Sequence, residues 1–332
     1  MYKARFVKLN FHERKKEKMG RKVSIVGAGY VGSTIAYTLA VSGNASELVL
    51  IDINQNKSFG EAMDIRQGAP YTAPIKIYSG SYQDAKDSDI VILTSGIARK
   101  PGQSRLDLAQ VNVNITKSII PEISRVAPNA VYIVVSNPVD ILTYVLCKRS
   151  GLSENQVIGS GTLLDTARLK SRLAETFSIN MQNVHGSVFG EHGDSSFIPW
   201  SLASISGMSV DEYAASVNFD LKNSDINQDS LEDYVRKSGS TIIDAKGATY
   251  YAISLSVNHI CGCIFRGIDT AIPVSTMMNG EYGISDVCLS TLNVVGKGGI
   301  RRKIISPLTD EEILRLRASA DKLKGVISQL SI

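Results

Sequence analysis

The chain of 332 residues is 43% hydrophobic and 20% charged, which is typical of a globular protein and excludes a disordered or fibrous one. It is long enough for one large or two moderate domains. Its net charge of +4 is local, because the first 22 residues hold nine Lys or Arg and two Glu, while the other 310 residues have a net charge of −3. No run of about 18 uncharged apolar residues is present, so we expect no membrane span.

The basic residues 1–20 form an arm that precedes the first apolar strand. The arm lacks the continuous apolar core of a secretory signal, and a solvated extension is the default for such a terminal charge run. Contact with a neighbouring subunit or with a polyanion stays open as an alternative. The four cysteines have no metal-ligand spacing, so we expect buried thiols, no metal site and a reducing, cytoplasmic location.

The first strand is predicted over 21–27 and leads through a glycine-rich turn into a helix over 34–42. The turn contains Gly27, Gly29 and Gly32, in the spacing of a dinucleotide-binding motif. The first glycine permits the tight turn, the second lets backbone amides approach a pyrophosphate, and the third packs the helix on the strand. Alone, such a triplet is weak support for a nucleotide site.

A second apolar strand over 47–52 strengthens this interpretation, because it ends in Asp52, twenty residues beyond the last glycine of the turn. A carboxylate at that place accepts hydrogen bonds from ribose hydroxyls and repels a 2′-phosphate. We therefore expect NAD rather than NADP as the cofactor, a preference that nearby Lys57 weakens without removing.

Strands continue to alternate with helices up to residue 159. The pattern predicts helices over 58–67, 107–125 and 139–149, and strands over 75–78, 89–94, 130–135 and 157–159. This alternation is typical of an α/β fold with a Rossmann, doubly wound parallel sheet, in which ligands bind beyond the carboxyl ends of the strands. We expect the NAD-binding domain to span 21–160.

The second half is less regular, and we expect it to form a mixed α+β catalytic domain over 161–332. Its pattern predicts helices over 163–177, 211–215, 230–265 and 309–330, and strands over 272–276, 286–294 and 300–305. Thr309 and Glu312 have the spacing of a capping box at the start of the last helix. No Pro- or Ser-rich linker separates the halves, so we expect them to pack together across a cleft.

Three side chains between residues 165 and 192 suit proton transfer at a bound carboxylate. Asp165 and Arg168 are three apart on a helical pattern and can project from one face, and His192 lies in a glycine-rich turn. A carboxylate fixes the tautomer of an imidazole and stabilises its charged form, while a guanidinium offers two parallel donors to a substrate carboxylate. The alternative is a surface ion pair and a solvated histidine.

The basic segment 96–105 follows a strand end and is bracketed by glycines. Such a segment suits a lid that closes over a bound anion, and a solvated loop with three cations is the alternative.

Four motifs, Gly-Ala-Gly-Tyr-Val-Gly, Ser-Asn-Pro-Val-Asp, Leu-Asp-Thr-Ala-Arg and Gly-Glu-His-Gly-Asp, occur in this order. Together they resemble the NAD-dependent L-lactate dehydrogenases and their malate dehydrogenase relatives, over residues 21 to about 330. The resemblance implies that His192 gives a proton to the keto oxygen in reduction and accepts it in oxidation, with Asp165 as its partner. It also implies that Arg168 binds the substrate carboxylate, that Arg105 is the lid cation and that Asn137 binds the reacting oxygen.

The resemblance also implies contacts to the cofactor and the substrate pocket. By position, the cofactor residues are Gly27, Gly29, Val31, Gly32, Asp52, Lys57, Tyr82, Gly96, Ile97, Ser118, Val135, Asn137, Ser160 and Ile253, and Thr249 lines the substrate pocket.

Arg99 departs from the lactate pattern, because lactate enzymes usually have a neutral Gln there and malate enzymes have Arg. An arginine can pair with the second carboxylate of oxaloacetate, whereas it has no partner on the methyl group of pyruvate. Glu191 and Thr249 match the lactate group, so we expect L-lactate dehydrogenase activity, with malate dehydrogenase as the alternative.

The family implies a homotetramer, a dimer of dimers. His185 matches a position at which many bacterial lactate dehydrogenases bind fructose 1,6-bisphosphate, and Lys170 stands where those enzymes have Arg, so this effector is a possible partner. A non-catalytic dinucleotide-binding module is a different class of function, but it predicts an incomplete set of Asp165, Arg168 and His192, whereas the sequence holds all three. Nucleic-acid binding through the arm lacks any accompanying aromatic pattern.

Overall fold

The computed structural model describes residues 20–97, 104–221 and 223–332. Its centre is a nine-stranded sheet in the order β12-β11-β10-β6-β5-β4-β1-β2-β3. The parallel part consists of β1 Lys22–Val26, β2 Glu47–Ile51, β3 Lys76–Ser79, β4 Ile90–Leu93, β5 Val131–Val134 and β6 Val157–Gly159. This is the predicted doubly wound α/β sheet.

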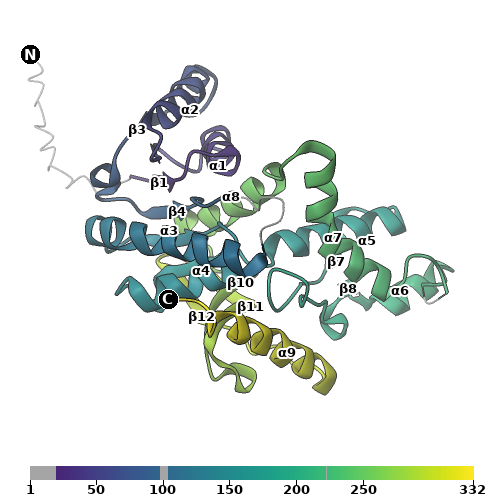
Figure 1. Cartoon of the computed structure of the whole chain (residues 1–332). Helices are drawn as coiled ribbons and strands as arrows, with labels where there is room; N and C mark the ends of the chain where they lie inside the picture. The colour runs from purple at the N-terminus through teal and green to yellow at the C-terminus, as the bar shows by residue number, and fades with distance from the viewer. Residues whose placement is uncertain (1–19, 98–103, 222) are drawn as a thin grey trace, which may run out of the picture.

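Helices cover both faces of the parallel strands, which is why the central strands β4 and β5 are continuous apolar runs, buried along their whole length, rather than alternating ones. Ile25, Leu48 and Ile92, one from each of three adjacent strands, are fully buried. The connecting helices are α1 Tyr30–Val41, α2 Gln55–Gln67, α3 Arg105–Val126 and α4 Val139–Arg149, with short 3-10 helices η1 Ala69–Tyr71, η2 Tyr82–Ala85 and η3 Glu154–Gln156. Figure 1 shows this part on the left, with α1 and α2 above α3 and α4.

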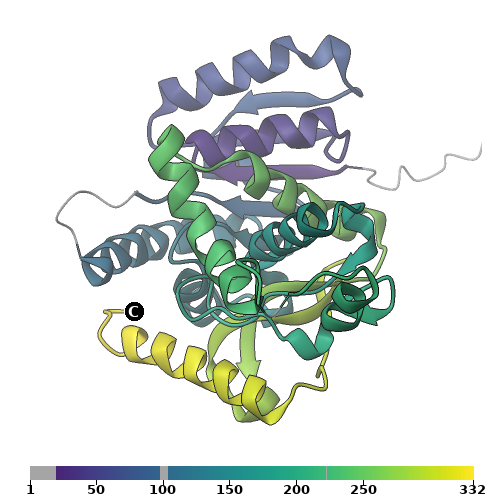
Figure 2. The same ribbon diagram turned by 90° about the vertical axis from the view of Figure 1, so that its right-hand side faces the viewer.

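The second half contributes both a lobe beside the sheet and an extension of the sheet. The lobe contains α5 Leu163–Phe177, η4 Met181–Asn183, β7 Val184–His185, η5 Trp200–Leu202, β8 Ser204–Ile205, β9 Met208–Ser209, α6 Val210–Ser216 and α7 Gln228–Lys246. The remaining elements are α8 Tyr251–Arg266, β10 Thr270–Asn279, η6 Glu281–Gly283, β11 Ser285–Gly296, β12 Gly299–Lys303 and α9 Asp310–Ile327. In Figures 1 and 2, α9 lies at the opposite end of the molecule from α2.

The main sheet crosses the domain boundary that the sequence suggested. Ser275 of β10 pairs antiparallel with Gly159 of β6, so the long hairpin of β10 and β11 continues the sheet of the first half. Gly159 is the residue that permits this approach, because a Cβ there would lie 2.4 Å from the Thr143 hydroxyl and 2.8 Å from the Ser275 Cβ.

One expectation for the second half needs correction, and three strands there were not expected. The helical pattern over 230–265 is two helices, because Gly247 ends α7 in the left-handed conformation with φ of 85°. The three short strands β7, β8 and β9 were not predicted, since two-residue strands carry no periodicity. The capping box of Thr309 and Glu312 is confirmed at the start of α9. In the described part of the chain, no helix combines the length and the apolar character needed to cross a membrane.

Candidate active site

The glycine-rich turn between β1 and α1 contains two glycines at which any larger residue would force neighbouring atoms to move. Gly27 has φ of 107°, and a Cβ on it would lie 2.7 Å from the backbone nitrogen of Ser95. A Cβ on Gly32 would lie 1.9 Å from the carbonyl oxygen of Gly27. The first and third glycines of the motif therefore allow the turn and the start of α1 to pack on β4.

Gly29 differs, because a Cβ on it would contact nothing within 4 Å and its φ of −75° suits any residue. It is the N-cap of α1, and no side chain caps this end of the helix. The space beside Gly29 is therefore open and no side chain of the described residues occupies the first amides of α1, which is the arrangement that binds a pyrophosphate. The turn fits the cofactor that the sequence suggested.

Asp52 follows β2 and lies beside this turn. Its Oδ2 accepts a hydrogen bond from Ala28 N at 2.7 Å, and its Oδ1 accepts one from Asn54 N at 2.9 Å. The acid therefore holds the turn in place, and its remaining lone pairs can accept from ribose hydroxyls. Lys57 is exposed on α2, and Tyr82 is half-buried in η2.

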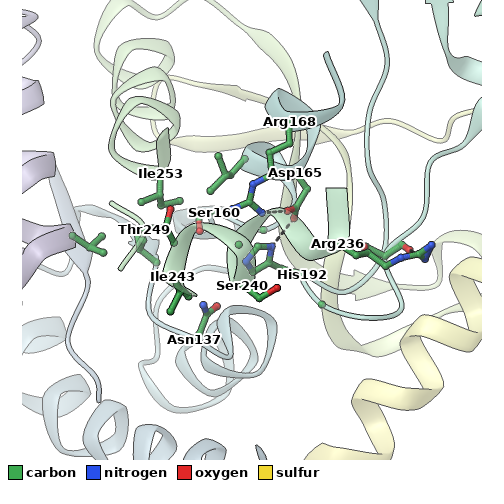
Figure 3. Close-up of a pocket in the computed structure, with 17 residues that line it drawn as sticks. Asn137, Ser160, Asp165, Arg168, His192, Arg236, Ser240, Ile243, Thr249 and Ile253 are labelled. Atoms are coloured by element: carbon green, nitrogen blue, oxygen red, sulfur yellow. Dashed lines mark hydrogen bonds and ion pairs between the residues drawn. The ribbon is translucent and has the colours of Figure 1, made fainter. Parts of the chain in front are cut away.

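Asp165 lies at the centre of the proposed catalytic group. It is buried in the first turn of α5, where its Oδ2 is 2.6 Å from His192 Nδ1 and its Oδ1 accepts from Arg168 Nη1 at 2.8 Å. One carboxylate thus binds the imidazole and the guanidinium together (Figure 3). Asp165, Arg168 and His192, which the sequence singled out, are brought together because α5 presents positions i and i+3 to the same loop.

The charges of this group shift its pKa values. The Asp165 carboxylate raises the pKa of His192 and outweighs burial, which lowers it; Asp140 also raises it and Arg168 opposes. Burial alone would raise the pKa of Asp165, but the charges of His192 and Arg168 and their hydrogen bonds hold it below its usual value. The group therefore favours a protonated imidazole beside an ionised carboxylate.

Asp140 fixes the backbone of the loop that carries His192, a role that was not predicted. Its Oδ2 accepts from His192 N at 2.8 Å, and the side chain lies wholly inside the protein in the first turn of α4. Burial raises the pKa of Asp140 to about 6, against the hydrogen bond from His192 N that lowers it. The sequence holds the residue in Ser-Asn-Pro-Val-Asp, but only the fold brings its carboxylate to residue 192.

A cavity of about 300 Å³ lies between the two halves of the chain and contains the proposed catalytic group. The predicted site residues that line it are Val31, Val135, Asn137, Ser160, Asp165, Arg168, His192, Thr249 and Ile253. They come from α1 and the ends of β5 and β6 on one side, and from α5, the His192 loop and the start of α8 with the residues just before it on the other. The cleft expected between the halves is therefore present. Figure 3 shows Asn137, Ser160 and Thr249 around His192.

One wall of the cavity was not predicted. Arg236, Gly239, Ser240 and Ile243 of α7 line it, together with Ser196 from the loop after His192. These four positions of α7 share one helix face, so their spacing could have suggested a common surface but not which surface it was. Gly239 lies against the Arg168 guanidinium, because a Cβ there would be 3.5 Å from Nη2.

Asn112 of α3 is a second residue that sequence reasoning missed. It is buried, its Oδ1 accepts from Ile97 N at 2.9 Å, and its Nδ2 donates to Ile97 O at 3.2 Å and Asn137 O at 2.8 Å. It therefore ties together the loops that follow β4 and β5. An asparagine on the buried face of a long apolar helix was the available indication.

The remaining predicted residues lie outside the cavity. Arg105 begins α3 and forms an ion pair with Asp194, two residues after His192, in which both side chains are largely exposed. Gly96 and Ile97 are exposed at the end of β4, and Ser118 is exposed on α3 with its hydroxyl bonded to Ile115 O. Arg99 falls outside the described residues.

The two candidate effector residues lie on neighbouring elements of the lobe. Lys170 is on α5, where burial lowers its pKa, and His185 is exposed on β7. Lys170 also lowers the pKa of His259 on α8, after the larger effect of burial, so its ammonium group lies near that helix.

The cysteines are unpaired, with Cys261, Cys263 and Cys288 buried. Within the described residues, no group of three or more His, Cys, Asp or Glu side chains is arranged to hold a metal ion.

Comparison with known proteins gives matches over nearly the whole chain. The family model described as lactate/malate dehydrogenase, NAD binding domain, matches residues 21–159, and the model of the alpha/beta C-terminal domain of the same family matches residues 162–331. The L-lactate dehydrogenase of Thermoanaerobacterium saccharolyticum is 45% identical over 94% of this chain and 99% of its own length. That of Acetivibrio thermocellus is 46% identical over 95% of this chain and 99% of its own length.

Solved structures give the same picture. The minor L-lactate dehydrogenase of Enterococcus mundtii, in its ligand-bound form, superposes with a TM-score of 0.88 at 38% identity, over 95% of this chain and all of the other. An L-lactate dehydrogenase of Clostridium thermocellum gives a TM-score of 0.82 at 40% identity, over 94% of this chain and 99% of the other.

Proposed function

Since this chain belongs to the lactate/malate dehydrogenase family, we propose that its cavity interconverts pyruvate and L-lactate with His192 as the group that moves the proton. The chain is an NAD-dependent L-lactate dehydrogenase, like the curated relatives that match it over nearly their full length. The observation that carries the roles of individual residues is the single Asp165 carboxylate bonded to both His192 and Arg168 at the wall of one cavity.

His192 supplies the proton of the reduction. Its Nδ1 is held by Asp165, so its Nε2 is the nitrogen left to act on a substrate oxygen in the cavity. As the keto carbon accepts a hydride, negative charge develops on the oxygen, and a protonated imidazole both stabilises that charge and gives up its proton. In the direction of oxidation the neutral imidazole takes the hydroxyl proton. Asn137, on the same cavity, is placed to donate a hydrogen bond to the same oxygen.

Arg168 binds the substrate carboxylate. One of its terminal nitrogens bonds Asp165, which leaves the other donors of the guanidinium for a second, planar acceptor. Its side chain is only 12% exposed, so this charge pair forms away from bulk water, where it is strong. Arg105, now paired with Asp194, is the cation that would approach the substrate from the lid.

The dinucleotide, when bound, supplies or receives the hydride. The chain offers it the open N-terminus of α1 at Gly29 for the pyrophosphate and Asp52 for the adenosine ribose. Val31, Val135, Ser160 and Ile253 line the cavity beside His192 and would surround the nicotinamide end. Gly96 and Ile97, which follow β4, and Tyr82, in the 3-10 helix after β3, would flank the rest of the molecule.

The test of the catalytic role is His192→Asn, compared with the wild type for NADH binding by fluorescence and for turnover of pyruvate. We expect NADH binding to stay and turnover to fall by about 10²–10³, the usual cost of removing one stabilising donor. Wild-type turnover in the variant would refute the proposal.

The preference for the side chain of the substrate depends on Thr249 and on Arg99, of which Arg99 lies outside the described residues. We propose pyruvate as the preferred substrate, in line with the relatives named above, although an arginine at 99 can pair with a second carboxylate. Specificity constants for pyruvate and oxaloacetate at equal NADH decide between them. Arg99→Gln should lower the constant for oxaloacetate more than that for pyruvate; a wild type that prefers oxaloacetate would contradict the assignment.

We also propose a cytoplasmic homo-oligomer, with four subunits as the family implies. Apolar side chains on α1 and α8 support this, because Tyr37, Val41, Tyr251 and Leu255 are each more than half exposed in the single chain. Sedimentation of the purified protein tests it. Activation by fructose 1,6-bisphosphate through Lys170 and His185 is a further proposal, and unchanged activity with this sugar at low pyruvate would contradict it.

A further inference from the structure

Glu232 of α7 is a buried carboxylate that lies between two arginines. Its side chain is 5% exposed. Arg315 of α9 binds it with both terminal nitrogens, Nη1 to Oε1 at 3.0 Å and Nη2 to Oε2 at 2.5 Å, and Arg236 donates from Nη2 to Oε2 at 3.2 Å. A two-pronged arginine contact fixes the carboxylate in direction as well as position.

Each member of this triad also holds one of three successive residues after the His192 loop. Arg236 Nη1 donates to Ser196 O at 3.2 Å. The Arg315 guanidinium lies 4.9 Å from the centre of the Phe197 ring, and Glu232 Oε1 accepts from Ile198 N at 3.2 Å. The triad therefore contacts residues 196–198 through a backbone carbonyl, an aromatic ring and a backbone amide.

This stretch closes the loop that carries His192. Phe189 and Phe197 form an antiparallel bridge, with hydrogen bonds of 2.9 and 3.1 Å between their backbones, so residues 190–196 are a loop with a fixed base. Asp140 holds the loop at His192 N, and Ser319 of α9 accepts from Glu191 N at 2.8 Å. The triad supplies the anchor on the C-terminal side of the base.

The triad also reaches the cavity directly. Arg236 lines it, on the same face of α7 as Gly239, which lies against Arg168. In Figure 3, Arg236 lies across His192 from Thr249 and Ile253. Helix α7 therefore contributes both to a wall of the cavity and to the contacts that hold the base of the His192 loop. A movement of α7 would affect both.

We infer that Glu232, Arg236 and Arg315 are positioning residues of the dehydrogenase reaction, which hold His192 against Asp165 and connect helix α9 to the active site. The inference rests on the proposed role of His192. A buried ion pair contributes little net stability when compared with apolar side chains of the same size, so its value here lies in the geometry that it imposes.

The test compares Arg315→Met with Lys237→Met. Lys237 pairs with Asp233 on the solvent side of α7 at 2.7 Å, with 70% and 52% of the two side chains exposed. Its substitution therefore removes a charge pair from α7, the helix that carries Glu232, without touching the loop. For Arg315→Met we expect the kcat of pyruvate reduction to fall by about 10- to 100-fold, the cost of a misplaced catalytic group, with the KM for NADH unchanged.

A pH profile separates positioning from simple loss of stability. When His192 spends less time against Asp165, its pKa falls, and reduction should decline at a lower pH than in the wild type. A less stable but correctly arranged enzyme would keep the wild-type pH profile. Lys237→Met should match the wild type in both measurements.

Arg315→Lys keeps the charge but loses the paired contact, so it should recover part of the kcat and of the pH profile. If Arg315→Met does not fold, Arg315→Lys and Glu232→Gln carry the same two measurements. The inference is overturned if the folded variants keep the wild-type kcat and pH profile. The proposed catalytic role of His192 is refuted by different results, namely wild-type turnover in His192→Asn, or a wild-type rate that does not depend on the titration of a histidine.

Discussion

Asp165→Asn is the substitution for which the structure gives the sharpest expectation. The amide has the size of the carboxylate but carries no charge, so it weakens both bonds that Asp165 makes, at 2.6 Å to His192 and 2.8 Å to Arg168. A hydrogen bond to a charged group contributes about 1.5–3 kcal/mol, which corresponds to a kcat for pyruvate reduction roughly 10- to 100-fold lower. Arg168, only 12% exposed, also loses its carboxylate partner, which should cost ~3 kcal/mol of unfolding free energy.

The pH dependence of Asp165→Asn follows from the sign of the shift at His192. The Asp165 charge raises the pKa of His192, whereas burial and Arg168 lower it, so removing the charge lowers the pKa. Reduction needs the protonated imidazole and is lost as pH rises through that pKa. The variant should therefore lose reduction at a lower pH than the wild type, and oxidation of lactate should persist to a lower pH.

The assay is the initial rate of NADH consumption with saturating pyruvate across a pH series, repeated with lactate and NAD. Asp233→Asn is the matched control, because it makes the same chemical change at an exposed carboxylate paired with Lys237. The control should behave as wild type. If the pH midpoint of Asp165→Asn coincides with that of the wild type, the reasoning about this carboxylate is wrong.

Three further predictions concern other parts of the site. Asp140→Ala leaves His192 N without an acceptor and should lower the unfolding free energy by ~1–3 kcal/mol in chemical denaturation. Asp140→Asn should keep most of that stability but lose pyruvate reduction at a lower pH than the wild type, since the Asp140 charge raises the pKa of His192. Gly29→Ala should fold normally but raise the KM for NADH on the order of tenfold. Gly32→Ala, with its Cβ 1.9 Å from Gly27 O, should lower the melting temperature instead. Equal effects of the two substitutions on KM and on melting temperature would contradict the pyrophosphate site. Arg168→Lys keeps the charge but not the fork, so the KM for pyruvate should rise roughly 10- to 100-fold with NADH binding unchanged, and an unaltered KM would exclude Arg168 as the carboxylate anchor.

Local motifs made much of the fold and site predictable. The glycine turn, Asp52 and the helix with Asp165 and Arg168 each depend on spacing within one element or between an element and the next turn. The predicted alternation of strands and helices along the chain also follows from local periodicity, and such an alternation is typical of the parallel sheet that is observed.

Contacts between distant segments were not predictable in the same way. Glu232 and Arg315 are 83 residues apart, and Asn112 meets Asn137 across two strand ends. Nothing in their local sequence separates them from ordinary polar residues on helices, because the fold as a whole decides which distant segment each side chain meets. The continuation of the main sheet into β10 is of the same kind, since the pairing with β6 depends on a single close approach at Gly159.

The two hydrogen bonds that Asp52 accepts bear on any attempt to redesign this enzyme for a phosphorylated cofactor. Replacing the acid by a neutral or basic side chain would remove the repulsion of a 2′-phosphate, but it would also release Ala28 N and Asn54 N, and with them the turn on which the cofactor is to lie. A cofactor swap at this position therefore has to provide a new acceptor for Ala28, and a single substitution of Asp52 should weaken NAD before it admits NADP.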